Sequence, residues 1–229
     1  PETLEHIITL PDGQDVTTQI PVRLNTDEAW ELHMRQAWMD IKMPKYPFKL
    51  KFGRQPFILG NGIYTNTNIA SVFGYQLYSD FGAGKPFIRL GSMKYYEGAR
   101  ESFNSSTGMN DADDADLFFV DGNMAIPNMD GSNIGAFVTY FNDRSFSMDR
   151  LYHYNVGLTA NLTLPMGIKV SSEFDYQIGG KEYYYTADGN DFDWTGYAFM
   201  AKAAIPPMLD NKLALAAEFG IGSGDDPAT

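Results

Sequence analysis

The chain has 229 residues, of which 29 are acidic and 17 basic, and it contains no cysteine. Its length fits a single domain, and its formal net charge of −12 argues against a nucleic-acid partner, which needs a basic face. No run of 18 apolar residues occurs, so a transmembrane helix is excluded. The mean hydropathy of −0.29 does not separate a soluble protein from a transmembrane β-barrel, because only every second residue of a barrel strand faces lipid.

Breaks between the hydrophobic runs alternate between short and long. Short turns rich in Pro and Gly recur about every 40 residues, at 44–47, 82–86, 127–131, 165–167 and 206–211. Longer, acid-rich breaks lie near 58–68, 98–116, 143–151, 179–193 and from 223 onward. This alternation is typical of a barrel with short periplasmic turns and long external loops. A WD40-type blade has a similar period but four strands, whereas each period here holds two long strands.

Residues 1–27 are predicted to form an N-terminal loop or a partial strand, and residues 28–229 a segment of a transmembrane barrel. Ten antiparallel strands are expected in that segment, at 29–43, 48–57, 70–81, 87–97, 117–126, 133–142, 152–164, 168–178, 194–205 and 212–222. Soluble strands usually have about 5–6 residues, and a tilted membrane strand needs about 9–11. The strand lengths therefore favour an all-β transmembrane barrel.

Alternation within the strands supports the same fold class. In 152–164 the apolar positions are Tyr152, Tyr154, Val156, Leu158, Ala160, Leu162 and Leu164, with polar or small residues between them. Aromatic residues gather toward strand ends, as in the two interfacial girdles of a barrel. A soluble sandwich, in which a second sheet covers the apolar face, is the alternative.

The order of turns predicts that further strands belong to the barrel. The first predicted strand starts on the long-loop side and the last one ends there. The sequence also has no initiator Met and no aromatic final residue. We therefore expect an incomplete barrel, with strands missing at each end.

Two segments resemble the alginate-export family of outer-membrane barrels. One is 29–64, an aromatic-rich strand with Ala37-Trp38-Met39-Asp40, a short turn, a strand ending in Gly53-Arg54-Gln55, and a loop containing Leu59-Gly60. The other is the closing run Glu218 to Gly222, followed by Ser-Gly-Asp-Asp. The resemblance implies a barrel of roughly 18 strands, within the range of bacterial barrels, that passes an anionic polysaccharide.

Charged residues on the polar strand faces are predicted to line the pore: Arg35, Lys49, Lys51, Arg54, Arg89, Asp121, Lys169, Glu173, Asp175, Lys202 and Glu218. Arg54 has the outward parity, so we expect Gly53 to mark a bulge that turns it inward. Lys49 and Lys51 are expected to form a basic ladder for carboxylates. The family's exporter has a strongly basic pore, and this mixture of acids and bases departs from it.

No catalytic constellation is visible, and we expect no enzymatic activity. The histidines His6, His33 and His153 are far apart and lack a nucleophile motif, and His153 is interpreted as a solvated lumen residue. No cofactor is expected. Two acidic clusters are candidates for Ca²⁺, although solvated external loops bridging ions to lipopolysaccharide are the favoured interpretation: Asp111, Asp113 and Asp114, and Asp188, Asp191 and Asp193.

The sequence thus predicts a passive channel, or porin, in the outer membrane of a Gram-negative bacterium. Its expected partners are the lipid bilayer, lipopolysaccharide and a hydrophilic, anionic polysaccharide-like solute. The alternative is a structural or scaffold surface barrel with acidic external loops, either plugged or sheathing a partner protein in a larger envelope complex. A secreted β-rich binding protein is a third hypothesis.

Overall fold

The computed structural model describes residues 3–9, 15–24, 32–34, 36–68, 71–79, 81–82, 85–96, 114–146, 149–183, 192–208 and 213–224. Its strands are β1 (Thr3–Thr9), β2 (Asp15–Leu24), β3 (Leu32–Met34), β4 (Ala37–Lys42), β5 (Phe48–Gln55), β6 (Ile58–Leu59), β7 (Thr65–Asn66), β8 (Val72–Ser79), β9 (Phe87–Tyr96), β10 (Ala115–Ala125), β11 (Asn133–Phe146), β12 (Asp149–Thr163), β13 (Lys169–Tyr183), β14 (Phe192–Met208) and β15 (Leu213–Gly222). One 3₁₀ turn, η1 (Pro165–Gly167), is the helical element of this part of the chain. No helix among the described residues is long and apolar enough to cross a membrane.

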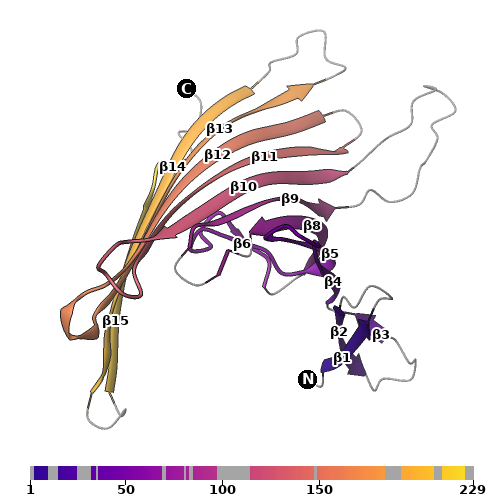
Figure 1. Ribbon diagram of the computed structural model, residues 1–229. Helices are drawn as coiled ribbons and strands as arrows, with labels where there is room; N and C mark the ends of the chain where they lie inside the picture. Colours follow the sequence, from indigo (N-terminus) through magenta and orange to yellow (C-terminus); the bar gives the residue numbers. More distant parts are fainter. Residues whose placement is uncertain are drawn as a thin grey trace, which may run out of the picture.

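Long antiparallel strands form one curved wall (Figure 1). The sheet runs in the order β1-β2-β4-β5-β8-β9-β10-β11-β12-β13-β14-β15, with β3 also paired to β2. Neighbours along the chain are neighbours in the sheet, as in an up-and-down barrel. Within the described strands the wall does not close on itself, because β1 and β15 stand at its two edges. The predicted all-β antiparallel fold is confirmed, and each of the ten predicted strands has its counterpart among β4, β5 and β8 to β15.

The two faces of the wall differ in chemistry because successive side chains of a strand point to opposite sides. We call one side the outer face; its mid-strand residues are large and apolar, and Val120, Val156 and Phe219 are 55%, 45% and 59% exposed. We call the other side the inner face; it includes the cross-strand row Gln76, Gly91, Phe119, Thr139, Asn155 and Gln177. A protein in water rarely exposes so continuous an apolar surface. No second sheet covers the outer face among the described residues, so the soluble sandwich is not the fold.

The short turns are closed by backbone hydrogen bonds. Met43 N donates to Phe48 O at 2.9 Å, Ile126 N to Ser132 O at 3.0 Å and Leu164 N to Ile168 O at 2.8 Å. Tight reversals of this kind hold the neighbouring strands in antiparallel register. These three turns therefore lie where the Pro and Gly pattern predicts them, whereas the start of the turn predicted at 206–211 belongs to β14.

Several predicted boundaries differ from the structure. Strands β11, β13 and β14 extend to Phe146, Tyr183 and Met208, beyond the predicted ends at 142, 178 and 205. Residues 1–27 contain the hairpin β1–β2, with Thr3 opposite Pro21, where a loop or a partial strand was predicted. The predicted strand 29–43 is split into β3 and β4, which pair with different parts of β2. Period-two alternation is too weak in these short runs to show where pairing is interrupted.

Candidate functional site

The segment 56–68, between β5 and β8, folds onto the inner face of the wall. We call it the inner segment; its strands β6 and β7 pair with each other (Figure 1). Phe57 and Leu59 are 0% exposed. They form the main hydrophobic core with wall residues of β9 to β11, namely Met93, Leu117, Phe119 and Phe137. The sequence predicted an external loop here, and that part of the prediction is wrong because the apolar side chains at 57 and 59 are buried against the wall.

A glycine in the wall makes room for this core. A Cβ placed on Gly157 would lie 2.1 Å from Cζ of Phe137, so the Phe137 ring occupies the space that a side chain at 157 would fill. The Phe137 ring therefore lies directly against the backbone of β12. This close approach explains why a glycine stands in the middle of an otherwise regular barrel strand.

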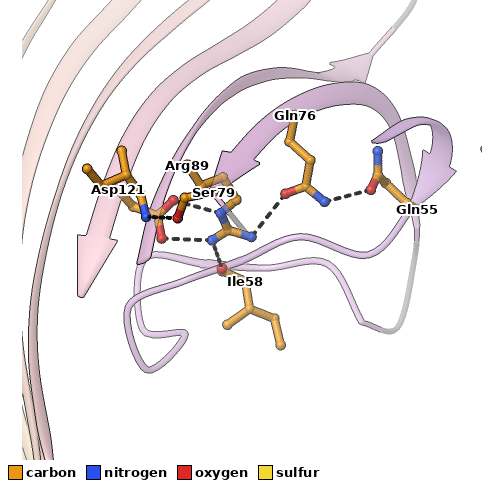
Figure 2. Close-up of polar contacts among 7 residues, drawn as sticks. Gln55, Ile58, Gln76, Ser79, Arg89 and Asp121 are labelled. Carbon is orange, nitrogen blue, oxygen red and sulfur yellow. Dashed lines mark hydrogen bonds and ion pairs between the residues drawn. The ribbon is translucent and has the colours of Figure 1, made fainter. Parts of the chain in front are cut away.

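Arg89 fixes one side of the inner segment (Figure 2). Its guanidinium donates to both carboxylate oxygens of Asp121, from Nε at 2.6 Å and from Nη2 at 3.0 Å. Nη2 also donates to the carbonyl of Ile58 at 2.7 Å, and Nη1 to Oε1 of Gln76 at 3.2 Å. Gln76 in turn donates to Gln55 at 2.9 Å. A bidentate pair of this kind is stronger than a neutral hydrogen bond and sets the geometry of both partners.

Glu173 of β13 fixes the other side of the inner segment. The backbone N–H of Asn61 donates to Oε2 of Glu173, and its side-chain amide donates to the carbonyl of Ser172 at 2.8 Å. Two residues further along the same face, Asp175 accepts a hydrogen bond from Asn155 at 3.0 Å. Glu173 is 0% exposed and Asp175 5%, and no ion pair joins either carboxylate to a Lys or Arg of the described residues. The inner segment is therefore held between the ion pair of Arg89 with Asp121 on one side and, on the other side, a strand that carries two acids without a basic partner among the described residues.

Tyr64 and His153 add a polar contact between the inner segment and β12. The Tyr64 hydroxyl and His153 Nε2 lie 2.5 Å apart. The imidazole also stacks on Phe141, with ring centroids 4.8 Å apart. Burial raises the pKa of Tyr64 to about 12. His153 is half-buried and has a partner, so its interpretation as a solvated lumen residue is wrong.

A hollow of about 690 Å³ lies beside Tyr64, between the inner segment and the wall at β12 to β15. Its volume is within the range of about 300–1,000 Å³ common for ligand pockets. Its lining residues are Ile63, Tyr64, Asn155, Asp175, Gln177, Trp194, Thr195, Gly196, Tyr197, Ala198, Gly222, Ser223 and Gly224.

Most of the predicted pore-lining residues share the inner face. The strand register places Lys49, Lys51, Arg89, Asp121, Lys169, Glu173, Asp175, Lys202 and Glu218 on it. Lys51 is cross-strand partner to Asp40, and its ammonium lies 3.8 Å from the centre of the Trp38 ring. Lys202 and Glu218 pair at 3.6 Å. That these residues line an open pore stays a prediction, and Arg35 lies outside the described residues.

Arg54 is a correction. Gly53 has a positive φ of 121°, but the register of β5 with β4 and β8 continues across it without a shift. Arg54 therefore stays opposite Phe73 on the outer face, and its Nε donates to the carbonyl of Ser71 at 3.1 Å. The contact lies at the long-loop end of β5, and charge near the membrane interface is tolerated better than at mid-bilayer.

The acidic clusters proposed for Ca²⁺ lie mostly outside the described residues, namely Asp111, Asp113, Asp188 and Asp191. Asp114 is paired with Lys94 at 2.6 Å, and Asp193 is exposed. In the described part of the chain, no group of three or more His, Cys, Asp or Glu side chains could hold a metal ion. The Ca²⁺ hypothesis for the loops stays a prediction.

Several residues that define the site were not predicted from the sequence. Asn61 and Tyr64 of the inner segment contact β13 and β12, and Asn155 and Trp194 line the hollow. One signal for the inner segment was present: the run Phe57-Ile58-Leu59 is apolar within a break that is otherwise polar. No local pattern marked the wall residues, because their partners are about 90 to 110 positions away.

Comparison with known proteins gives structural neighbours only. No family model and no curated protein sequence matches the chain. Among solved structures, a loop L8 deletion mutant of OmpT, an outer membrane protein of Vibrio cholerae, matches with 12% identity and a TM-score of 0.50. The match covers 96% of this chain and 84% of that chain. A trimer form of OmpT from the same organism, folded in vitro, matches with 12% identity, covers 96% and 79%, and has a TM-score of 0.49. At this identity the likeness shows the fold.

The expectation that the chain lacks enzymatic activity is corrected. It depended on isolated histidines, but His153 bonds Tyr64, and buried carboxylates stand nearby on β13. The fold shared with the loop deletion mutant of OmpT does not exclude catalysis either, since one fold hosts different functions. Catalysis is therefore no longer excluded on the grounds of sequence.

The strands, the apolar outer face and the solved neighbours agree on one architecture. Long antiparallel strands pair in chain order, and apolar side chains cover the face that meets lipid. The solved structure with this fold, the loop deletion mutant of OmpT, is that of an outer membrane protein. The chain thus has the fold of an outer-membrane β-barrel.

Proposed function

We propose that the chain forms the wall of a passive outer-membrane channel for hydrophilic solutes. The observation that carries the proposal is the inner segment, which lies across the polar inner face and is anchored at both sides. Arg89 holds the carbonyl of Ile58, and Glu173 accepts the N–H of Asn61. A segment fixed in this way narrows a water-filled passage without filling it, and the size and charge of the narrow part select solutes.

The polar hollows beside the inner segment support a passage rather than a plug. One hollow of about 420 Å³ lies between Asn61 and the ion pair of Lys202 with Glu218, separate from the hollow beside Tyr64. The resemblance of 29–64 to the alginate-export family supports a channel as well. An anionic polysaccharide is one substrate implied by that resemblance, and the basic ladder of Lys49 and Lys51 is its proposed contact.

Conductance tests the proposal. The full-length protein, folded in detergent and inserted in a planar bilayer, should give discrete current steps. Replacing residues 58–66 with a Gly-Ser linker should increase the step size, and Asn61→Gly, which removes the amide bond to Ser172, should increase current fluctuations. Tyr46→Ala, in an exposed short turn, is the control and should change neither. A well-folded protein without current steps would favour the structural or scaffold barrel.

Ion selectivity tests the ladder separately. Reversing the charge of Lys49 and Lys51 to Glu should shift selectivity toward cations, because both side chains lie on the inner face. Unchanged selectivity would leave the ladder without a role while the channel proposal stands.

A further inference from the structure

The hollow beside Tyr64 has a chemistry of its own, and its interpretation rests on the proposed function. It is enclosed on one side by the inner segment and on the other by β12 to β15. None of its lining residues is Lys, Arg or His, although bases occur elsewhere on the inner face. Asp175 lines it and has no basic partner among the described residues. An anion entering this hollow would meet a carboxylate with no compensating charge.

Two buried acceptor atoms belong to side chains of this hollow. Oδ2 of Asp175 and Oδ1 of Asn155 have no hydrogen-bond donor among the described residues. Asp175 is 5% exposed and Asn155 1% exposed. A buried acceptor without a donor is costly, by about 1–3 kcal/mol. A bound molecule that brings hydroxyl hydrogens would remove that cost.

Donors and acceptors are mixed around the hollow. Asn155 and Gln177 carry amides that both donate and accept, and the hydroxyl of Ser223 does the same. An ammonium ion offers only donors, so it would leave the amide N–H groups unmatched. A hydroxyl group donates and accepts, and it fits both halves of each amide.

Aromatic surface completes the set. Tyr64 and Trp194 both line the hollow, one from the inner segment and one from β14. Aromatic rings offer flat apolar area with a polar edge, which suits a molecule with C–H faces and hydroxyl edges. We propose that the hollow between the inner segment and β12 to β15 is a binding subsite for a neutral, hydroxyl-rich solute of the sugar class. This assignment replaces the anionic polymer for this part of the channel.

Binding and conductance are measured on the same full-length protein in detergent and in bilayers. The probes are a neutral glucose tetrasaccharide, the uronic-acid tetrasaccharide and spermidine. The neutral sugar should change the fluorescence of Trp194 in a saturable way and interrupt the channel current, with at least tenfold weaker binding of the uronic acid. Trp194→Phe should abolish the fluorescence change, whereas Trp38→Phe, on β4, should retain it.

Asp175→Asn is the informative variant, because it keeps the shape and removes the charge. Discrimination against the uronic acid should fall in this variant. If Asp175→Asn does not fold, Gln177→Ala is the second test, and it should weaken binding of the neutral sugar at least threefold. Tighter binding of the uronic acid or of spermidine than of the neutral sugar overturns the inference, as does a conducting channel that no sugar interrupts. Sugar binding without any current would instead refute the proposed channel and leave the subsite in place.

Discussion

The pair of Arg89 and Asp121 gives the sharpest test of how the inner segment is held. Arg89→Met keeps the length of the side chain and removes the four hydrogen bonds that the guanidinium donates. The two side chains are 14% and 11% exposed, so Asp121 would be left as a nearly buried carboxylate without its partner. The carbonyl of Ile58 would lose its donor at the same time.

The expected loss of unfolding free energy follows from that burial. Removing one partner of a buried ion pair costs about 3–5 kcal/mol. We expect about 3 kcal/mol for Arg89→Met, at the lower end of that range, because both side chains retain some exposure. Asp121→Asn should be destabilising as well. The double variant should lose less than the sum of the two, with a coupling free energy of about 2 kcal/mol.

Urea unfolding of the protein folded into lipid vesicles, followed by Trp fluorescence, measures these free energies. The control pair is Lys202 with Glu218, whose side chains are 49% and 56% exposed and 3.6 Å apart. An exposed pair contributes about 0–1 kcal/mol, so its double-mutant cycle should be nearly additive. If the cycle for Arg89 and Asp121 were additive to within about 0.5 kcal/mol, this pair would not hold the inner segment, and the reasoning would be refuted.

Three further perturbations test the wall and its core. Gly157→Ala should reduce the unfolding free energy in urea by about 1–3 kcal/mol, because the new methyl group occupies the place of the Phe137 ring. Val156→Arg, in the middle of the outer face, should cost about 2–4 kcal/mol in vesicles. The stabilisation from the raised pKa of Tyr64 should be complete below pH 10, the usual tyrosine pKa, and lost as pH rises through about 12. Tyr64→Phe should remove that alkaline loss, measured as unfolding free energy against pH.

Each of these has a matched comparison. Gly220→Ala should be mild, since its Cβ would lie 3.8 Å from the nearest atom, the carbonyl oxygen of Phe199. Val156→Leu keeps the outer face apolar and should be nearly neutral. If Val156→Arg left the unfolding free energy unchanged, this result would argue against lipid on the outer face. If the unfolding free energy of Tyr64→Phe still fell at alkaline pH, the loss would come from another titrating group.

The wall could be predicted from sequence because its physics is local. Lipid on one side and water on the other impose period two on each strand, so the alternation at 152–164 matches β12 at Asp149–Thr163. Arg54 shows the limit of the same reasoning. The glycine at position 53 was taken as a sign of a bulge. Its φ is positive, but the register is set by pairing with both neighbouring strands and does not shift.

The inner segment could not be predicted, because its stability comes from residues distant in sequence. Phe57 and Leu59 read as a short apolar run in a polar loop, and nothing near them says which wall they meet. Their partners become apparent only when Met93, Leu117 and Phe137 are brought to one face by the sheet. The bond between Tyr64 and His153 likewise joins two strongly separated positions, 89 residues apart.

The net charge of the inner face is the property that the charged residues of a single strand predict least well. The bases on the inner face suggested a path for anions, but Arg89 is matched by Asp121, and Lys51 lies opposite Asp40. Paired charges largely cancel for a passing solute, so the field depends on groups that no neighbouring strand neutralises. On β13 these include Asp175, which has no basic partner among the described residues. If the chain forms the proposed channel, this carboxylate beside the inner segment should therefore disfavour solutes with negative charge.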